Sequence, residues 1–218
     1  MKHTPIHTYI VNIPSRLDRR RSVESQFQDK PEFDVIFVEA VQHHNGAVGI
    51  WQSLIKVIQM AQNAGYERII FCEDDHIFTP DYSAEYLYNN IREAEDKGAE
   101  LIAGGICGYG VSVPVGNHLY WIDWYWGNQF LVINKKLFPR ILEHNFAPHH
   151  TADGVLSWIT NAKMTIFPFI SVQKEFGYSD ITATNGRKGF INGLFDGTVE
   201  RLRPIHSINR TFNHNIKK

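Results

Sequence analysis

The sequence has few cysteines, little net charge and no long apolar segment. Cys72 and Cys107 both lie in apolar surroundings without the spacing of metal ligands, which indicates buried free thiols and a reducing compartment. Lys and Arg number 22 against 23 Asp and Glu, so the strongly basic surface of a nucleic-acid-binding protein is absent. No run approaches the roughly 18 apolar residues of a membrane span, although contact with a membrane surface stays open.

The N-terminal sequence lacks the features of a secretory signal peptide. Its opening, MKHTPIHTYIVNIP, has too short an apolar run and enters a strand pattern at once. We therefore expect a soluble, cytoplasmic protein. With 218 residues, of which 43% are hydrophobic, the chain is long enough for one domain with a sizeable core.

Strand and helix patterns alternate along the first half of the chain. The clearest helix has its apolar residues on one stripe and Gly65 as a stop, and another is expected to begin with Thr79 as N-cap and Pro80 after it. The predicted strands are 7–13, 34–40, 68–72 and 101–103, and the predicted helices are 16–27, 49–64 and 79–97. This alternation is typical of an α/β fold with a mostly parallel central sheet flanked by helices.

The second half of the chain is less regular. Strands are predicted at 120–126 and 129–134, helices at 135–144 and 152–162, and a loop-like basic tail at 186–218. We interpret the chain as a single domain, 1–218, with an N-terminal half at 1–105 and a second half at 106–185.

Three carboxylates follow directly on the apolar strand 68–72. In open α/β sheets, ligands bind outside the carboxyl ends of the strands, and Glu73, Asp74 and Asp75 lie at such an end. Adjacent carboxylates raise each other's pKa unless a cation neutralises them, and Mg²⁺ commonly takes one or two carboxylates plus substrate phosphates. The pattern favours a divalent-metal site for a phosphorylated substrate over an acidic loop in which Asp74 or Asp75 merely turns the chain.

The strand–EDD–helix arrangement resembles the metal and nucleotide-sugar motif of GT-A glycosyltransferases, a version of their DXD signature. YIVNIPSRLDRR, GIWQSLIKVIQMAQNAGYERIIFCEDDHIF and QKEFGYSDI are similar to segments of the lipopolysaccharide-biosynthesis family that includes the collagen galactosyltransferases. EDDHIFTPDYSAEYL also resembles the EDD segment of the N-glycan N-acetylglucosaminyltransferases. The resemblance implies a GT-A fold, with a Rossmann-like, mostly parallel sheet.

The resemblance also implies roles for the acidic cluster. Asp75 would be the direct Mn²⁺ or Mg²⁺ ligand, and Asp74 and Glu73 would contact the ribose, metal-bound water or the nucleotide. His76 departs from the apolar residue common after the triplet, and is either a hydrogen-bond donor to Asp75 or a surface histidine. His206, late in the chain as in many GT-A enzymes, would be the third metal ligand.

The segment after the first strand is a second place where such folds contact the nucleotide base and ribose. By that resemblance Asn12, Pro14, Ser15 and Arg16 are candidate nucleotide-sugar contacts. The arginines at 19–21 follow on the next helix, where helical spacing sends their side chains in different directions. One or two of them face a ligand, or all three lie on a solvated helix face.

Asp153 is a candidate general base at the start of a predicted helix. An inverting transferase must deprotonate the acceptor hydroxyl, which a placed carboxylate can do, and both families resembled have an acidic residue at a comparable position. The alternative is that Asp153 is only the N-cap of the helix. The neighbouring His149 and His150 are possible transition-metal ligands, but adjacent side chains usually diverge.

The aromatic-rich stretch 118–130 is a candidate sugar-binding surface. Asp123, Trp126, Asn128 and Gln129 place polar groups beside aromatic planes, a combination found in carbohydrate sites. The alternative is that much of this stretch belongs to the core.

Together with the resemblance, these patterns predict a metal-dependent glycosyltransferase of the hexosyltransferase type, in which 1–105 is the nucleotide-sugar-binding half and 106–185 the acceptor and catalytic half. It would move a sugar from a nucleotide-sugar, most simply a UDP-sugar, to a saccharide acceptor, and the resemblance implies bacterial polysaccharide or lipopolysaccharide synthesis. Two other classes remain open, a metal-dependent phosphohydrolase or pyrophosphorylase and a non-catalytic nucleotide-sugar-binding domain.

Overall fold

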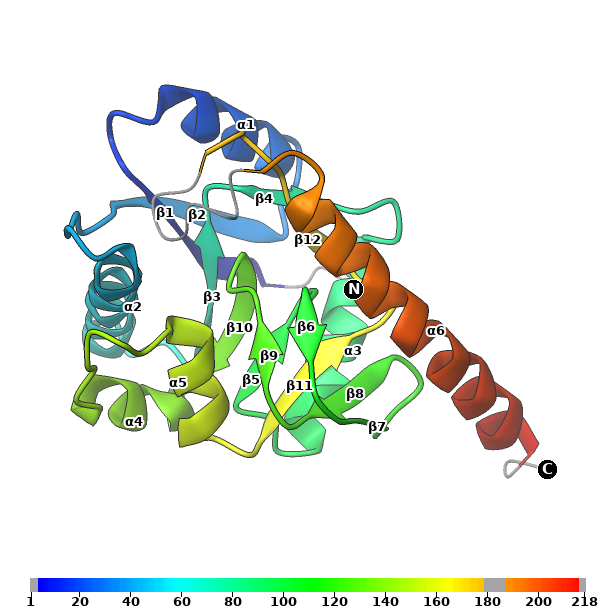
Figure 1. Cartoon of the computed structure of the whole chain (residues 1–218). Helices are drawn as coiled ribbons and strands as arrows, with labels where there is room; N and C mark the ends of the chain where they lie inside the picture. Colours follow the sequence, from blue (N-terminus) through cyan, green and yellow to red (C-terminus); the bar gives the residue numbers. More distant parts are fainter. Residues whose placement is uncertain (1–3, 179–186, 216–218) are drawn as a thin grey trace.

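An eight-stranded mixed sheet forms the centre of the computed structural model, which describes residues 4–178 and 187–215 (Figure 1). The strand order is β2-β1-β3-β10-β5-β11-β8-β7, and all of these strands except β10 and β8 run in the same direction. The α/β prediction, with a mostly parallel sheet flanked by helices, is therefore confirmed. The strands are β1 (Ile6–Asn12), β2 (Phe33–Glu39), β3 (Arg68–Glu73), β5 (Leu101–Ala103), β7 (Ser112–Pro114), β8 (Leu119–Ile122), β10 (Phe130–Asn134) and β11 (Lys163–Ile166).

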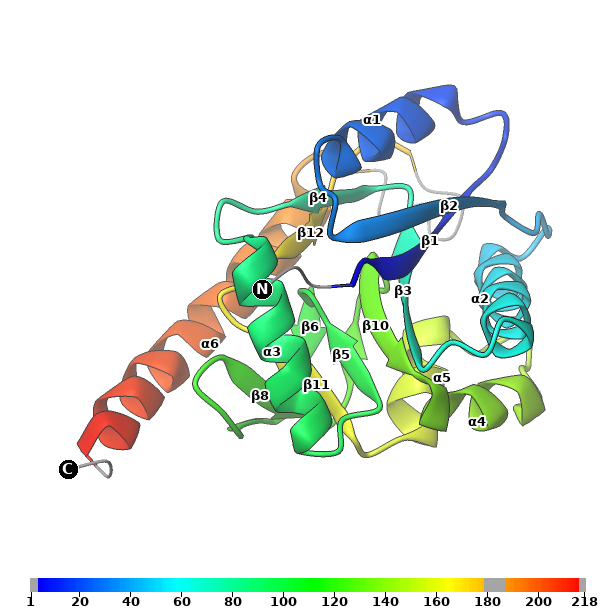
Figure 2. The same ribbon diagram turned by 180° about the vertical axis from the view of Figure 1, so that it is seen from behind.

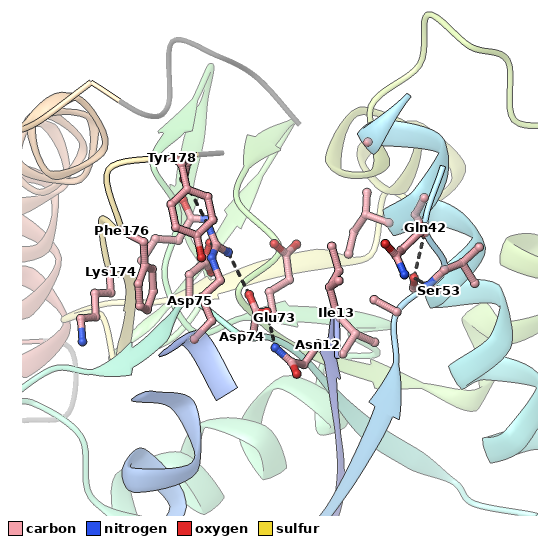
Figure 3. A pocket seen from close by; sticks show the side chains of 18 of the residues that line it. Asn12, Ile13, Gln42, Ser53, Glu73, Asp74, Asp75, Lys174, Phe176 and Tyr178 are labelled. Atoms are coloured by element: carbon pink, nitrogen blue, oxygen red, sulfur yellow. Dashed lines mark hydrogen bonds and ion pairs between the residues drawn. The ribbon is translucent and has the colours of Figure 1, made fainter. Parts of the chain in front are cut away.

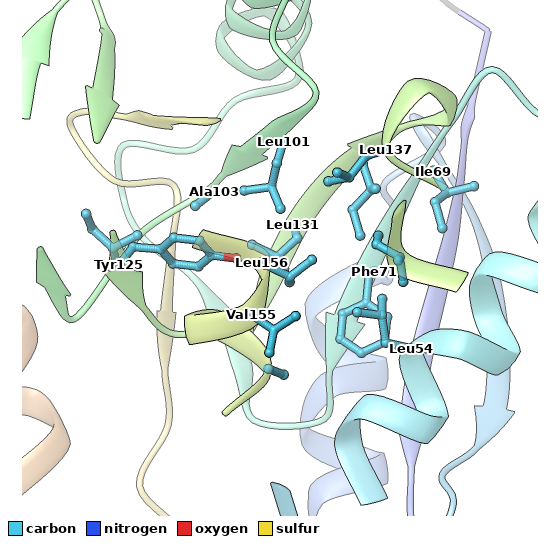
Figure 4. Close-up of a cluster of buried hydrophobic side chains, with 14 of the residues drawn as sticks. Leu54, Ile69, Phe71, Leu101, Ala103, Tyr125, Leu131, Leu137, Val155 and Leu156 are labelled. Carbon is cyan, nitrogen blue, oxygen red and sulfur yellow. The ribbon is translucent and has the colours of Figure 1, made fainter. Parts of the chain in front are cut away.

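Helices cover both faces of this sheet, because the central strands carry apolar side chains on both sides. On β3, Ile69 and Phe71 join the cluster that contains Leu54 of α2 (Figure 4), whereas Ile70 belongs to the cluster that contains Leu87 of α3. The first face carries α2 (Gly46–Asn63), α4 (Phe138–Glu143) and α5 (Ala152–Ile159). The short 3₁₀ helix η1 (Lys135–Leu137) directly precedes α4. The second face carries α1 (Leu17–Phe27) and α3 (Ala84–Asp96), seen from behind in Figure 2.

Two small antiparallel sheets lie beside the central one. β4 (His76–Phe78) pairs with β12 (Ser171–Gln173), and β6 (Gly108–Tyr109) pairs with β9 (Tyr125–Trp126). The predicted strand 120–126 is thus two strands, β8 and β9, separated by a bend at Asp123 and Trp124. β4, in the first of these small sheets, begins directly after the turn formed by Asp74 and Asp75.

The C-terminal region is a long helix, so the prediction of a loop-like tail is wrong for most of its length. α6 (Phe190–Asn215) runs along the outside of the domain and extends beyond it (Figures 1 and 2). Ile191, Phe195 and Leu202 are buried on its inner face, at the spacing of one helical stripe. No helix in residues 4–178 and 187–215 is long and apolar enough to cross a bilayer.

Three local predictions are changed or settled by the structure. The N-cap of α3 lies four residues later than expected, at Ser83, whose hydroxyl accepts from the Tyr86 amide at 3.1 Å. Thr79 lies too far before α3 to cap it, and its hydroxyl instead accepts from the Asp81 amide at 3.3 Å and donates to the carbonyl of Phe169 beside β12. His76 is fully buried, which excludes a surface histidine. It is not a donor to Asp75 either, because its Nδ1 lies 2.8 Å from the Ser171 hydroxyl and its Nε2 has no hydrogen-bond partner in the part of the chain that the structure describes. Cys72 and Cys107 are free and buried, as predicted.

Candidate functional site

A cavity of about 280 Å³ opens at the carboxyl ends of β1, β2 and β3 (Figure 3). Parallel strands bring their carboxyl ends to one edge of the sheet, where ligands of open α/β folds bind. The cavity has a charged end, formed by Asp74, Asp75, Arg19 and residues 174–178. Its other end is formed by the segment 40–43 and the first turns of α2. Glu73, the last residue of β3, lies between the two ends.

Asp74 is held by two side chains from the first strand and helix. The Asn12 side-chain amide donates to Oδ2 of Asp74 at 2.8 Å, and the Arg19 guanidinium donates to Oδ1 at 2.9 Å. Both carboxylate oxygens are therefore engaged within the protein. The structure thus places Asn12 beside Asp74, which fixes the turn that presents its neighbours. The predicted contacts of both residues with a nucleotide stay predictions.

Arg19 is the cation of this site, a role that the sequence left open among three adjacent arginines. Besides Asp74 it approaches Asp75, with 3.5 Å between Nη1 and Oδ2. Its guanidinium lies over the rings of Phe176 and Tyr178, each 4.9 Å away. It also donates to the Tyr178 carbonyl at 3.3 Å, so α1 holds residues 174–178 as a wall of the cavity.

Glu73 and Asp75 remain electrostatically costly despite Arg19. Burial raises the pKa of Asp75 to about 7, although the nearby Arg19 charge opposes that rise. Burial also raises the pKa of Glu73 well above its ordinary value, and the charges of Asp75, Asp74 and Asp153 add to the effect. Oδ1 of Asp75 is buried without a hydrogen-bond partner among the described residues. A cation bound here would relieve this repulsion.

The acidic cluster suits a divalent cation only if the ligand supplies part of the coordination. No group of three or more His, Cys, Asp or Glu side chains in the described ranges is placed to hold a metal ion. Glu73 and Asp75 line the cavity, and Asp75 has the unpartnered buried oxygen. Two carboxylates completed by phosphate oxygens and water are the set that Mg²⁺ commonly uses, so the residues fit such a cation.

The other end of the cavity is built from backbone and small side chains. Ser53 donates to the carbonyl of Gly49 at 2.8 Å and accepts from the amide of Val41 at 2.8 Å, which joins α2 to the segment after β2. A Cβ on Gly49 would lie 2.7 Å from the Val41 carbonyl oxygen, so only glycine permits this approach. The sequence indicated a polar loop here but not its part in the cavity, although its place after a strand end was the available signal.

Residues 14–16 form the turn after β1 and lie beside the cavity rather than in its wall. Pro14 and Ser15 are exposed. The Arg16 guanidinium lies 4.2 Å from the centre of the Tyr178 ring, and its carbonyl accepts from the Asn12 side chain at 3.4 Å. Their predicted contact with a nucleotide stays a prediction.

Asp153 lies on α5 but is not its N-cap. Thr151 caps that helix, since its hydroxyl accepts from the Gly154 amide at 3.2 Å. Oδ2 of Asp153 accepts from the Gly127 amide at 3.2 Å, and Oδ1 accepts from Gly154 at 2.8 Å. The capping interpretation of Asp153 is therefore wrong, and its carboxylate is close enough to contribute to the raised pKa of Glu73.

The candidate sugar contacts between 123 and 129 divide into inner and outer residues. Gln129 is fully buried and donates to the carbonyl of Gly105 at 2.8 Å, and Asn128 accepts from the Tyr125 hydroxyl at 3.4 Å. These two have structural partners in the core. Asp123 and Trp126 instead lie at the surface, on the β8–β9 bend and on β9.

The candidate metal-binding histidines do not join the acidic cluster. Nδ1 of His206 lies 2.7 Å from the Tyr120 hydroxyl, on the inner face of α6. His150 accepts from the Ala147 amide at 3.0 Å, and its ring centre is 4.5 Å from that of the exposed His149. Ser179 and Asp180, part of the GYSDI stretch, lie outside the described residues.

No family model matches the chain, and no curated protein matches it by sequence. Among solved structures, it is similar to a glycosyltransferase involved in the glycosylation of the major capsid of PBCV-1, with 11% identity, a TM-score of 0.49, and coverage of 76% of this chain and 83% of that one. It is also similar to UDP-glucose pyrophosphorylase complexed with UDP-glucose, with 9% identity, a TM-score of 0.49, and coverage of 91% and 100%. A197 from STIV gives 15% identity, a TM-score of 0.47, and coverage of 78% and 86%. Identities and TM-scores this low assign no function to the chain, and the site is interpreted from its own geometry.

Proposed function

We propose that the protein is a metal-dependent glycosyltransferase of the GT-A type that transfers a sugar from a UDP-sugar to a saccharide acceptor. The observation that supports this most is the position of Glu73 and Asp75. Both face a cavity at the carboxyl end of β3, and Asp75 has a buried oxygen without a hydrogen-bond partner among the described residues. Bacterial polysaccharide or lipopolysaccharide is the proposed acceptor class.

The donor would span the two ends of the cavity. Its nucleoside would lie between Asn12, the segment 40–43 and the start of α2, and its diphosphate would lie at the charged end. Asp75, with Glu73 beside it, would hold the Mn²⁺ or Mg²⁺ ion, whose positive charge stabilises a leaving nucleoside diphosphate. Arg19 would contribute a second positive charge at that end, within charge-assisted hydrogen-bond reach of phosphate oxygens.

Asp153 is the proposed general base. In an inverting transfer, the acceptor hydroxyl gives its proton to a carboxylate as its oxygen bonds to the anomeric carbon, and the bond from that carbon to the diphosphate breaks. Asp153 has the required chemistry, and its two backbone hydrogen bonds from Gly127 and Gly154 fix the orientation of its carboxylate.

Calorimetric titration with UDP, with and without Mn²⁺, tests the donor site. We expect UDP to bind much more tightly when Mn²⁺ is present, because a cation held by Glu73 and Asp75 would offset the negative charge of the diphosphate. Asp75→Asn should remove this metal dependence, whereas Asp81→Asn, at an exposed position outside the cavity wall, should not. Failure of UDP to bind under both conditions would refute the proposal.

Product analysis then separates transfer from the other reactions that use the same carboxylates. A transferase releases UDP from a UDP-sugar in step with glycoside formation, and Asp153→Asn should slow that release without weakening UDP binding. Formation of a sugar 1-phosphate would identify a pyrophosphorylase or phosphohydrolase. Tight UDP binding without any turnover would identify a binding domain.

A further inference from the structure

Two exposed tryptophans lie side by side next to the carboxylate site. Trp124 and Trp126 are 37% and 49% exposed, and their ring centres are 5.2 Å apart with an angle of 50° between the planes. They come from the β8–β9 bend and from β9, which pairs with β6. Single exposed apolar side chains are normal on a protein surface, whereas adjoining ones form a patch that can mark a binding site.

Gly108 on β6 lets the Trp126 ring lie directly against the strand backbone. A Cβ on Gly108 would lie 2.7 Å from the Trp126 ring, and a Cβ on Gly110, just after β6, would lie 2.4 Å from Nε1 of Trp124. Tyr109 between them is buried. The Trp126 ring is therefore supported on one side by the backbone, and the Trp124 ring approaches the backbone at its indole nitrogen, while both side chains remain partly exposed.

Polar groups accompany the two rings. Oδ1 of Asp123 accepts from the amides of Val111 and Trp124, each at 2.8 Å, so the carboxylate is held in one orientation. Arg201 of α6 donates to the carbonyls of Tyr109 and Gly110, at 2.9 and 3.0 Å, and supports β6 from α6. A rigid aromatic surface with a fixed hydrogen-bond acceptor at its edge suits a sugar ring, which presents apolar C–H faces and peripheral hydroxyls.

This surface continues into the proposed catalytic site through a single residue. Gly127 follows Trp126 directly, and its amide donates to Oδ2 of Asp153 at 3.2 Å. Two residues further on, the carbonyl of Gln129 accepts from the amide of Glu73 at 3.2 Å. A saccharide whose reacting hydroxyl lies at Asp153 would extend outward past Trp126.

We propose that Trp124 and Trp126 form a subsite that binds the neutral pyranose rings of the saccharide acceptor, with Asp123 accepting hydrogen bonds from their hydroxyl groups. The identity of this ligand as an acceptor rests on the proposed transferase function. The presence of a saccharide site does not, because the two rings and Asp123 can bind a glycan whether or not the chain catalyses transfer. The subsite therefore has a test of its own.

The test is the retention of the protein on an array of neutral oligosaccharides. We expect the wild-type protein to bind at least one linear glycan, Trp126→Ala to weaken that binding about tenfold or more, and Trp126→Phe to retain much of it, since a flat ring remains. Gly108→Ala should also weaken it, because the added Cβ displaces the Trp126 ring without deleting it. Trp158→Ala is the matched control, because Trp158 is 73% exposed on α5.

UDP titration of the same variants separates this subsite from the donor site. Trp126→Ala and Gly108→Ala should bind UDP with Mn²⁺ as the wild type does, which also shows that they fold. If no neutral glycan is retained while UDP binds, the subsite is refuted and the donor site stands. If glycans are retained and UDP does not bind, the donor site is refuted and the subsite stands. The proposal would also be overturned if Trp126→Ala left glycan binding unchanged, or if the variant lost self-association of the protein and not glycan binding.

Discussion

Replacing Arg19 with glutamine would leave the carboxylates of Asp74 and Asp75 without their cation. The three side chains are only 11–14% exposed, so solvent screens the charges weakly. Removing one partner of a buried ion pair costs roughly 3–5 kcal/mol, chiefly because the other charge stays buried and unpaired. Glutamine can still donate one hydrogen bond to Asp74, so we expect a loss of about 3 kcal/mol in the free energy of unfolding at pH 8.

Part of this loss should depend on pH. The folded pKa of Asp75, about 7, exceeds its ordinary value of 3.8, so stability falls as the pH rises through that window and the carboxyl ionises in the folded state. At pH 8, one unit above this pKa, ionisation of Asp75 lowers the free energy of the folded wild type by about 1.4 kcal/mol relative to the same folded state with Asp75 protonated. Without Arg19 the pKa rises further and most of this contribution disappears. At pH 5.5 the carboxyl is largely protonated in both proteins, so the substitution should cost about 1 kcal/mol less.

Urea unfolding followed by circular dichroism at pH 8 and pH 5.5 measures both quantities. Arg21→Gln, at an exposed position on the same helix, should change stability by less than about 0.5 kcal/mol at either pH. If Arg19→Gln costs no more than this control, Arg19 is not the cation of the site. An equal cost at both pH values would refute the assignment of the raised pKa to Asp75.

Three further substitutions test the surroundings of the site. Burial lowers the pKa of His76 to about 3, so on acidification the unfolded chain binds this proton before the folded chain does. The wild type should therefore lose about 2 kcal/mol in the free energy of unfolding from this group between pH 8 and pH 5. His76→Gln should lose correspondingly less in urea titrations at the two pH values. Gly105→Ala should lower the melting temperature strongly, because its Cβ would lie 2.0 Å from the Ser171 carbonyl oxygen. Gly193→Ala on α6 is the contrasting variant, with nothing within 4 Å of the new Cβ, and its free energy of unfolding should rise by about 0.5–1 kcal/mol. Leu54→Ala should cost roughly 2–5 kcal/mol in urea unfolding, because Leu54 is 1% exposed against β3; a cost below 1 kcal/mol would contradict the packing.

The elements that periodicity predicted well are those whose burial is decided locally. α2 differs from the predicted helix 49–64 mainly by one added turn at its start, and β3 from the predicted strand 68–72 by one residue. β11 was missed because its first residue is a lysine. Lys163 is nevertheless fully buried, and its ammonium donates to the Thr160 carbonyl at 2.8 Å. The burial of such a residue depends on its neighbours in the tertiary structure, and a local sequence pattern does not contain that information.

The candidate site divides in the same way. Asn12, Glu73 and Asp75 could be predicted together, because the topology of a parallel sheet brings strand ends to one edge. Arg19 could not be distinguished from the arginines beside it, because its partner Asp74 is 55 residues away in the chain. The same holds for the wall at 174–178, which is brought to the cavity by the pairing of β12 with β4 and by the contacts of Arg19.

The neighbouring positions of β5 and β10 have a consequence for how this fold could diversify. The chain leaves β5 at Gly104 and enters β10 at Phe130, where the Gly104 amide donates to the Phe130 carbonyl at 2.9 Å. The segment between them, which includes Trp124 and Trp126, has fixed ends, so its length adds little to the entropy cost of closing it. Because β7 and β8 of this segment belong to the central sheet, a replacement that kept β8 beside β11 could exchange the rest as a cassette. In the proposed transferase, acceptor preference would then change while the donor cavity stayed the same.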